Sequence, residues 1–244
     1  MTLAPKPGMS PLRFRLITTA VVAVLLVASH AALPDVRERA FAQYAFVITL
    51  GYGHLLGAAL GVRWHRERSL LGGAFGVVTI ATLFAVYVEA LAAWSWLGLP
   101  LLALSVWHFT ENDVALAEAL RTGCAVGPLP RDAKTHGVAL AAAALVVACA
   151  VAASPDEGLL ADLFCASVLF HLVGWLVFLI ARGASLSHLL ALHAPLAALC
   201  AALLAWPGAA AAPLREFVFS SPIYLFWATL HVVDSALARG RALA

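Results

Sequence analysis

The sequence predicts an all-α polytopic membrane protein with about eight transmembrane helices and with both termini in the cytoplasm. Hydrophobic residues make up 63% of the 244 residues, charged residues make up only 11%, and the mean hydropathy is +0.94. A soluble domain of this size needs far fewer apolar residues. The apolar residues also fall into eight runs, each close to the ~20 residues that cross ~30 Å of hydrocarbon.

The predicted spans follow one another along almost the whole chain, at residues 16–33, 41–62, 69–88, 90–110, 137–153, 159–181, 184–206 and 217–237. Basic residues precede the first span as they do in a signal peptide, but Leu33-Pro34-Asp35 lacks a small-residue cleavage site, so we expect an anchor. The span 137–153 is short and rich in alanine. We expect one membrane domain at 16–237, between a cytoplasmic segment at 1–15 and a cytoplasmic tail at 238–244.

The charges between the spans predict the orientation, because Lys and Arg favour cytoplasmic loops. With the N-terminus inside, three arginines lie outside (Arg37, Arg39 and Arg215), and twelve basic residues lie inside: Lys6, Arg13, Arg15, Arg63, Arg66, Arg68, Arg121, Arg131, Lys134, Arg182, Arg239 and Arg241. The longest connection, 111–136, is then cytoplasmic, although 115–120 can continue the preceding helix for a turn or two. The prediction is a multi-pass protein of the cell inner (cytoplasmic) membrane.

The charge and the cysteines exclude two classes of function. A net charge of +2, with basic residues in short clusters between apolar runs, does not indicate nucleic-acid binding. The cysteines lack CxxC spacing, so we expect small core residues and neither a disulfide framework nor a zinc framework. They are Cys124, Cys149, Cys165 and Cys200.

Histidine is the most informative residue type of this chain. Six of the nine histidines lie within about 15 Å of the cytoplasmic end of a predicted span, at 1.5 Å per residue. They are His54, His108, His171, His188, His193 and His231. A titratable ring inside a bilayer is costly unless it is paired, bound to a metal or facing a cavity, so several rings at one depth predict a shared site. We expect His30, His65 and His136 at surfaces or interfaces.

Imidazole as the main ligand type narrows the chemistry of such a site. Neutral imidazole binds iron, copper, zinc and nickel, whereas thiolates favour zinc or clusters and oxygen shells favour magnesium or calcium. Without paired cysteines, and with few carboxylates at this depth, a histidine-rich iron site is the leading interpretation. The alternative for each histidine is a packing role, in which the ring bonds to a carbonyl or hydroxyl of a neighbouring helix.

Glycines recur every four residues beside the first of these histidines. Gly53, Gly57 and Gly61 predict a small face on which another helix packs closely, which would bring His54 near that helix. An incidental histidine on a packing helix is the alternative reading.

Polar residues follow two of the histidines closely. Glu111 and Asn112 stand three and four residues after His108, on the same face if the helix continues, so we predict that they orient its ring. Asp234 stands three residues after His231 and is predicted to play the same part, or else to help end the last helix.

These motifs, in this order, resemble those of the Brp/Blh family of bacterial and archaeal membrane proteins. That family cleaves β-carotene centrally to retinal with non-haem iron held by histidines. The resemblance spans roughly residues 45–237 and rests on the Gly-rich helix around His54, the segment Trp107-His108-Phe109 followed by acidic residues, the segment Phe170-His171-Leu172-Val173-Gly174-Trp175, and His231 in the last helix. It implies that His54, His108, His171 and His231 are the iron ligands.

The chain departs from the family pattern at two motifs. The family has a Pro-His-Gly core with an acid shortly after it, where this chain has Tyr52-Gly53-His54-Leu55. The family also has two histidines four residues apart, where Trp175 follows His171 here. His188 and His193 form a pair on the next helix, but at five residues they point about 140° apart. It stays open whether either replaces His171 or His231, and whether the site is complete.

The resemblance implies a dioxygenase in which Fe(2+) binds O₂ beside a polyene double bond. Histidine ligands leave coordination positions open, and aromatic walls exclude water around an apolar substrate. The implied wall residues are Trp107, Phe109, Trp175 and Trp227. A rhodopsin apoprotein would be the downstream partner for retinal.

Three other functions compete with this one. A haem b protein would place axial histidines on two helices, for example His54 with His108 or His171 with His231. A proton-coupled transporter would use the histidines as a relay, with Glu89 and Asp162 as partners. In a structural membrane protein the histidines would only join helices.

Overall fold

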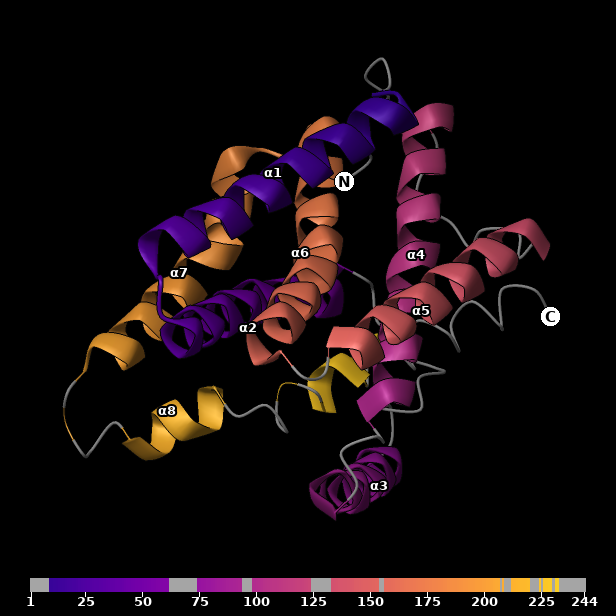
Figure 1. The fold of residues 1–244 in the computed structure, drawn as a ribbon. Helices are drawn as coiled ribbons and strands as arrows, with labels where there is room; N and C mark the ends of the chain where they lie inside the picture. The colour runs from indigo at the N-terminus through magenta and orange to yellow at the C-terminus, as the bar shows by residue number, and fades with distance from the viewer. Residues whose placement is uncertain are drawn as a thin grey trace. The chain divides into compact units, whose positions relative to one another are not determined.

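Helices form the described part of the chain, which contains no strand (Figure 1). The computed structural model describes residues 9–61, 74–93, 98–123, 133–153, 156–206, 208, 212–219, 224, 226–229 and 231–232. The helices are α1 (Pro11–Ala32), α2 (Val36–Gly61), α3 (Ala74–Ala93), α4 (Gly98–Thr122), α5 (Ala133–Ala153), α6 (Glu157–Ala181), α7 (Leu186–Ala205) and α8 (Ala212–Val218). The predicted all-α class is therefore confirmed, and α1 to α7 correspond in order to the first seven predicted spans.

Several helices begin at residues that satisfy their free backbone amides. Ser10 accepts a bond from the Arg13 amide at 3.2 Å, and proline occupies the first turn of α1. Asp156 accepts from the Leu159 amide at 3.0 Å at the start of α6. Such caps define where a helix starts more sharply than hydropathy does, which is why α1 begins several residues before its predicted span.

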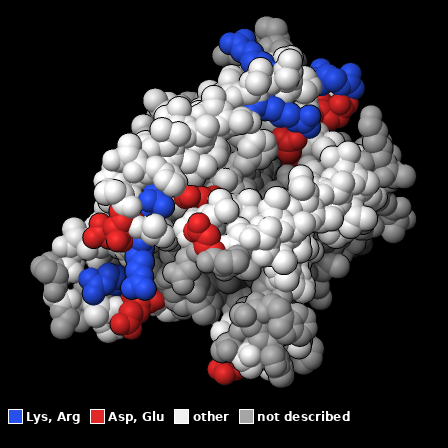
Figure 2. Space-filling view, viewed as in Figure 1, with Lys and Arg blue, Asp and Glu red and all other residues white. Residues whose placement is uncertain are grey.

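Three helical stretches of the described residues are long and apolar enough to cross a membrane. They are Pro11–Ala32, Thr135–Ala153 and Ala161–Ala181. In α1, the side chains of Leu16, Val24 and Val27 are exposed by 60%, 66% and 69%, as expected of a surface that contacts lipid. In the space-filling view, charged side chains gather in small groups and leave broad areas without charge (Figure 2). These features support membrane association, while eight spans and cytoplasmic termini stay predictions.

The chain divides into two compact units that several helices share. The first unit comprises Met1–Val47 and Leu102–Ala191, and the second comprises Ile48–Leu101 and Leu192–Ala244. In the first unit α1 and α6 pack in antiparallel directions. Near one end of the pair, a Cβ on Gly174 would lie 3.6 Å from Cζ of Phe14, and near the other end His30 bonds to Asp162.

The C-terminal part of α4 belongs to the core of the first unit. Its Leu116 and Leu120 pack in one buried cluster with Phe14 of α1 and Phe178 of α6. Arg15 forms an ion pair with Asp113 in which Nη2 and Oδ2 are 2.7 Å apart. Arg182 donates to the Gly123 carbonyl at 2.8 Å.

The connection 111–136 is shorter in the structure than the sequence predicts. α4 continues to Thr122 and α5 starts at Ala133, so only the residues between them connect the helices. The residues 115–120 are alanine, leucine and glutamate, which favour helix, and Glu118 pairs with Arg121 one turn later. The loss of hydropathy after residue 110 marks the end of an apolar run and not the end of a helix.

In the second unit α2 contacts the C-terminal part of the chain. The Tyr52 hydroxyl donates to the Val218 carbonyl at 3.0 Å, and the Tyr52 and Tyr224 rings meet edge to face with centroids 5.7 Å apart. Gly51 provides the room, because a Cβ there would collide with the Tyr224 ring.

The predicted last span, 217–237, is not one continuous helix. α8 ends at Val218, Phe219 is a turn, and the described residues are helical again at Tyr224, 226–229 and 231–232. The sequence Ser220-Ser221-Pro222 supplies the physical reason, because proline lacks an amide hydrogen and disfavours helix in the residue before it.

Candidate metal centre

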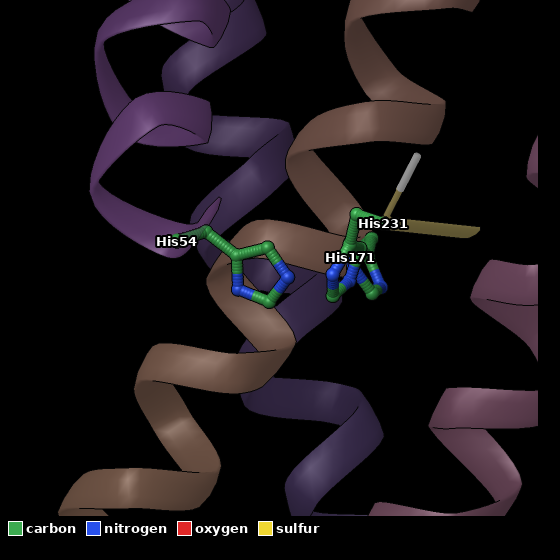
Figure 3. A group of neighbouring side chains, drawn as sticks. All are labelled: His54, His171 and His231. Atoms are coloured by element: carbon green, nitrogen blue, oxygen red, sulfur yellow. The ribbon is translucent and has the colours of Figure 1, made fainter. Parts of the chain in front are cut away.

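Two of the predicted ligand histidines meet in the second unit. His54 on α2 and His231 on the C-terminal helical segment lie edge to face, with ring centroids 5.2 Å apart and an interplanar angle of 86° (Figure 3). Both side chains are partly buried. Because 177 residues of sequence separate the two rings, no local pattern predicts this contact; it depends on the packing of the C-terminal segment against α2.

A third imidazole of the same unit lies directly against α2. A Cβ built on Gly53 would be only 2.5 Å from Cδ2 and 2.9 Å from Nε2 of His193. At Gly53, an imidazole ring on α7 therefore packs against the small face that the sequence predicts. The His193 ring thus packs against the residue of α2 that immediately precedes His54. His188 is on α7 too, but its side chain falls outside the described residues.

The other two predicted ligands meet in the first unit. His108 on α4 and His171 on α6 are both buried, and their ring centroids are 5.5 Å apart. The Phe109 ring stacks on the His171 ring with centroids 4.5 Å apart and an interplanar angle of 21°. The aromatic and histidine motifs of α4 and α6 therefore form one cluster, with Phe109 covering one face of an imidazole.

Asn112 holds the His108 ring, as the spacing of four residues predicts. Asn112 Nδ2 lies 2.9 Å from His108 Nε2, so this ring nitrogen is engaged by the amide. A bond of this kind fixes the orientation of an imidazole and selects its tautomer.

Glu111 faces a different helix from Asn112. Its carboxylate lies 3.5 Å from Nδ1 of His136 on α5, and the Trp107 ring lies beside the same imidazole with centroids 6.1 Å apart. Trp107 and Glu111, four residues apart, thus face α5, whereas His108 and Asn112 face the His171 side. His136 lies near the start of α5 and is partly exposed.

The predicted substrate-wall residues lie in different surroundings. Phe109 stacks on His171, and Trp175 meets Phe178 edge to face at 5.8 Å. Trp227 is 50% exposed and lies beside Phe226. Phe109 is thus the wall residue with a direct ring contact to a predicted ligand, while Asp234 and His65 lie outside the described residues.

Sequence reasoning missed the contacts that glycines make with aromatic side chains in the second unit. Tyr224 at Gly51 and His193 at Gly53 both fill space that a missing Cβ leaves open. The only local signal is the Gly51-Tyr52-Gly53 spacing itself, which places the two glycines two residues apart and so on different sides of α2.

The free cysteines match their predicted structural role in part. Cys165 and Cys200 are buried, and Cys149 is exposed. The rings of His54 and His231, and those of His108 and His171, lie beside one another, so the donors that these two pairs offer are imidazole nitrogens.

No protein-family model, no curated protein and no solved structure matches this chain. The resemblance to the Brp/Blh family consequently stays a prediction based on the order of the histidine motifs.

Proposed function

We propose that this chain is a multi-pass membrane enzyme that cleaves a lipophilic polyene such as β-carotene with O₂, using an iron ion held by histidines. The observation that carries the proposal is a group of three histidines, His54, His171 and His231, that could hold a metal ion (Figure 3).

The donor set fits a first-row transition metal. Three imidazole nitrogens suit iron, copper, zinc or nickel, and three protein ligands leave coordination positions for small molecules. Iron bound there would supply the binding and activation of O₂.

The residues around His171 explain how the chain itself would support such an ion. Phe109 covers one face of the His171 ring, and His108 lies beside it with its own ring held by Asn112. An imidazole fixed on both sides has few other orientations, so its ligand nitrogen is preorganised and the cost of binding the ion falls. His108 thereby acts as a positioning residue for His171 in this proposal, in place of the ligand role that the resemblance implies.

The proposed class of substrate rests on the aromatic side chains beside the histidines. A ring such as Phe109, which stacks on His171, would exclude water there and favour a long hydrocarbon over a polar molecule. Retinal would be the product, and a rhodopsin apoprotein would be a suitable acceptor for it.

The ring contacts disfavour a haem between either pair. His54 and His231 are in edge-to-face contact, and His108 and His171 lie at a similar separation. Axial ligands of one haem need a porphyrin plane between them, which rings already in contact do not leave.

The test combines metal analysis with a colour assay in a bacterial host that accumulates β-carotene. We expect the wild type to contain about one iron per chain, to bleach the orange host and to form retinal. His54→Ala and His231→Ala should each lose the iron and the bleaching, because removing one of three ligands typically costs most of the affinity. His136→Gln is the matched control, since it removes a half-exposed histidine that is not in the group.

Two results would contradict the proposal. Purified, active wild type without stoichiometric transition metal would remove the metal centre, and a Soret band would assign the histidines to haem. Iron that is retained without bleaching would keep the metal site and exclude β-carotene as the substrate.

A further inference from the structure

A second polar cluster lies where the end of α1 meets α2 and α6, all within the first unit. His30 Nε2 lies 2.8 Å from Asp162 Oδ2, and Gln43 Nε2 donates to Asp162 Oδ1 at 2.7 Å. Gln43 Nε2 also donates to Ser29 Oγ at 3.0 Å. Four side chains from three helices therefore share one chain of short contacts, none of which belongs to the histidine pairs above.

The amide of Gln43 is only half satisfied in this arrangement. Gln43 is 5% exposed, and its Oε1 is buried without a hydrogen-bond partner in the described part of the chain. A buried acceptor without a partner costs about 1–3 kcal/mol. Rotating the amide by half a turn would bring Oε1 to the position of Nε2, next to oxygens of Asp162 and Ser29. The Ser29 hydroxyl already donates to the Leu26 carbonyl at 2.7 Å, so its hydrogen would not bridge to the rotated amide oxygen, and that oxygen would be repelled by the Asp162 carboxylate unless a cation lay between them.

The charges around the cluster leave Asp162 with room for a cation. Its partners in the described residues are the Gln43 amide and His30. The neighbouring Arg39 is buried, but it donates to the Leu33 carbonyl at 3.1 Å and the Pro34 carbonyl at 3.4 Å. Since Arg39 donates to these backbone carbonyls, the Asp162 carboxylate accepts instead from the neutral Gln43 amide.

We propose that Ser29, His30, Gln43 and Asp162 form a binding site for a divalent transition-metal cation of the zinc type, separate from the centre at His54. An imidazole nitrogen and a carboxylate oxygen are the principal ligands, and the rotated Gln43 amide and the Ser29 hydroxyl complete the donor set. Such a cation joins α1, α2 and α6 at one end.

The spacing of the donor atoms suits such an ion after a small expansion. Zinc binds histidine nitrogen and carboxylate oxygen at about 2.0–2.2 Å, which sets the donors of a tetrahedral site about 3.3 Å apart. The contacts of 2.7, 2.8 and 3.0 Å would each lengthen by a few tenths of an ångström. His30 is 48% exposed, so an ion has a path to the cluster from solvent.

The test is a titration of the metal-free, full-length protein in detergent with ZnCl₂ against a chromophoric zinc indicator. We expect His30→Gln and Asp162→Asn to weaken one class of zinc site at least tenfold, and zinc to raise the melting temperature of the wild type but not of His30→Gln. His136→Gln is the matched control, because His136 also lies beside a carboxylate, Glu111, but without the amide and hydroxyl seen here.

A second background separates this site from the proposed iron centre. In His54→Ala the zinc bound at Asp162 should persist, and adding His30→Gln should remove it. Unchanged zinc binding in His30→Gln overturns the inference even if Asp162→Asn fails to fold, since His30 is half exposed and its replacement is mild. Loss of all zinc in His54→Ala alone overturns it too, while leaving the histidine centre intact.

Discussion

The contact between His193 and Gly53 allows a sharp test of the second unit. In Gly53→Ala, the new Cβ would meet His193 Cδ2 at 2.5 Å and Nε2 at 2.9 Å. Carbon atoms in contact are about 3.5–4.0 Å apart, so the ring has to retreat by about 1 Å. Overpacking of this kind costs about 1–3 kcal/mol, and alanine in a helix returns up to about 1 kcal/mol relative to glycine. We expect Gly53→Ala to lower the free energy of unfolding by up to about 2 kcal/mol.

Gly137→Ala is the matched control for helix propensity. Gly137 lies in α5, is exposed, and has no atom within 4 Å of an added Cβ, so this variant should gain up to about 1 kcal/mol. The difference between the two variants, about 1–3 kcal/mol, isolates the steric cost at Gly53. At about 2–4 °C per kcal/mol, thermal unfolding in detergent resolves it.

A double-mutant cycle identifies the side chain responsible. If His193 is the obstacle, His193→Ala should relieve the cost of Gly53→Ala, with a coupling energy of about 0.5–3 kcal/mol. Equal melting temperatures of Gly53→Ala and Gly137→Ala would refute the reasoning, and so would two single effects that simply add.

Two further predictions concern α4. Burial raises the pKa of Asp113, and the Arg15 guanidinium opposes this effect only in part. Because the folded protein then binds the proton more tightly than the unfolded chain, this contribution to stability is complete below about pH 4 and is lost as the pH rises through the raised pKa. Asp113→Asn should therefore flatten the pH profile of the unfolding free energy in this range, and an unchanged profile would contradict the raised pKa. Asn112→Ala should lower the free energy of unfolding by about 1–3 kcal/mol and shift the ¹⁵N resonances of the His108 ring, because Nε2 of this buried ring loses its amide partner. Unaltered resonances would show that the Asn112 amide does not hold the ring.

The positions of the helices could be predicted from the sequence because hydropathy and helix signals act locally. The apolar runs mark α1 to α7 in order. The errors have local causes as well: alanine, leucine and glutamate carry α4 past its apolar run, and α8 ends at Val218 with a turn at Phe219. Hydropathy measures the transfer of side chains to lipid, whereas the ends of helices depend on propensity and capping.

The pairing of the histidines could not be predicted in the same way. Depth along a helix follows from counting residues, and it placed His54, His108, His171 and His231 at similar levels. Which rings meet depends on the rotation of each helix about its axis and on which helices are neighbours, and neither is encoded in spacing along one helix. His54 therefore meets His231, and His108 meets His171, although the haem alternative considered other pairs.

The two polar residues after His108 show that spacing along one helix does not decide which of them contacts the His108 ring. On an α-helix both the third and the fourth residue lie near the first, so Glu111 and Asn112 were equal candidates for its partner. Successive residues are nonetheless rotated by about 100°, and the packing of α5 takes Glu111 towards His136 while Asn112 stays on His108. A neutral amide on His108 adds no negative charge to this ring, whereas a carboxylate would have made it more basic. The choice of neighbour thus changes the chemistry of the imidazole, and this favours a positioning role for His108 beside His171.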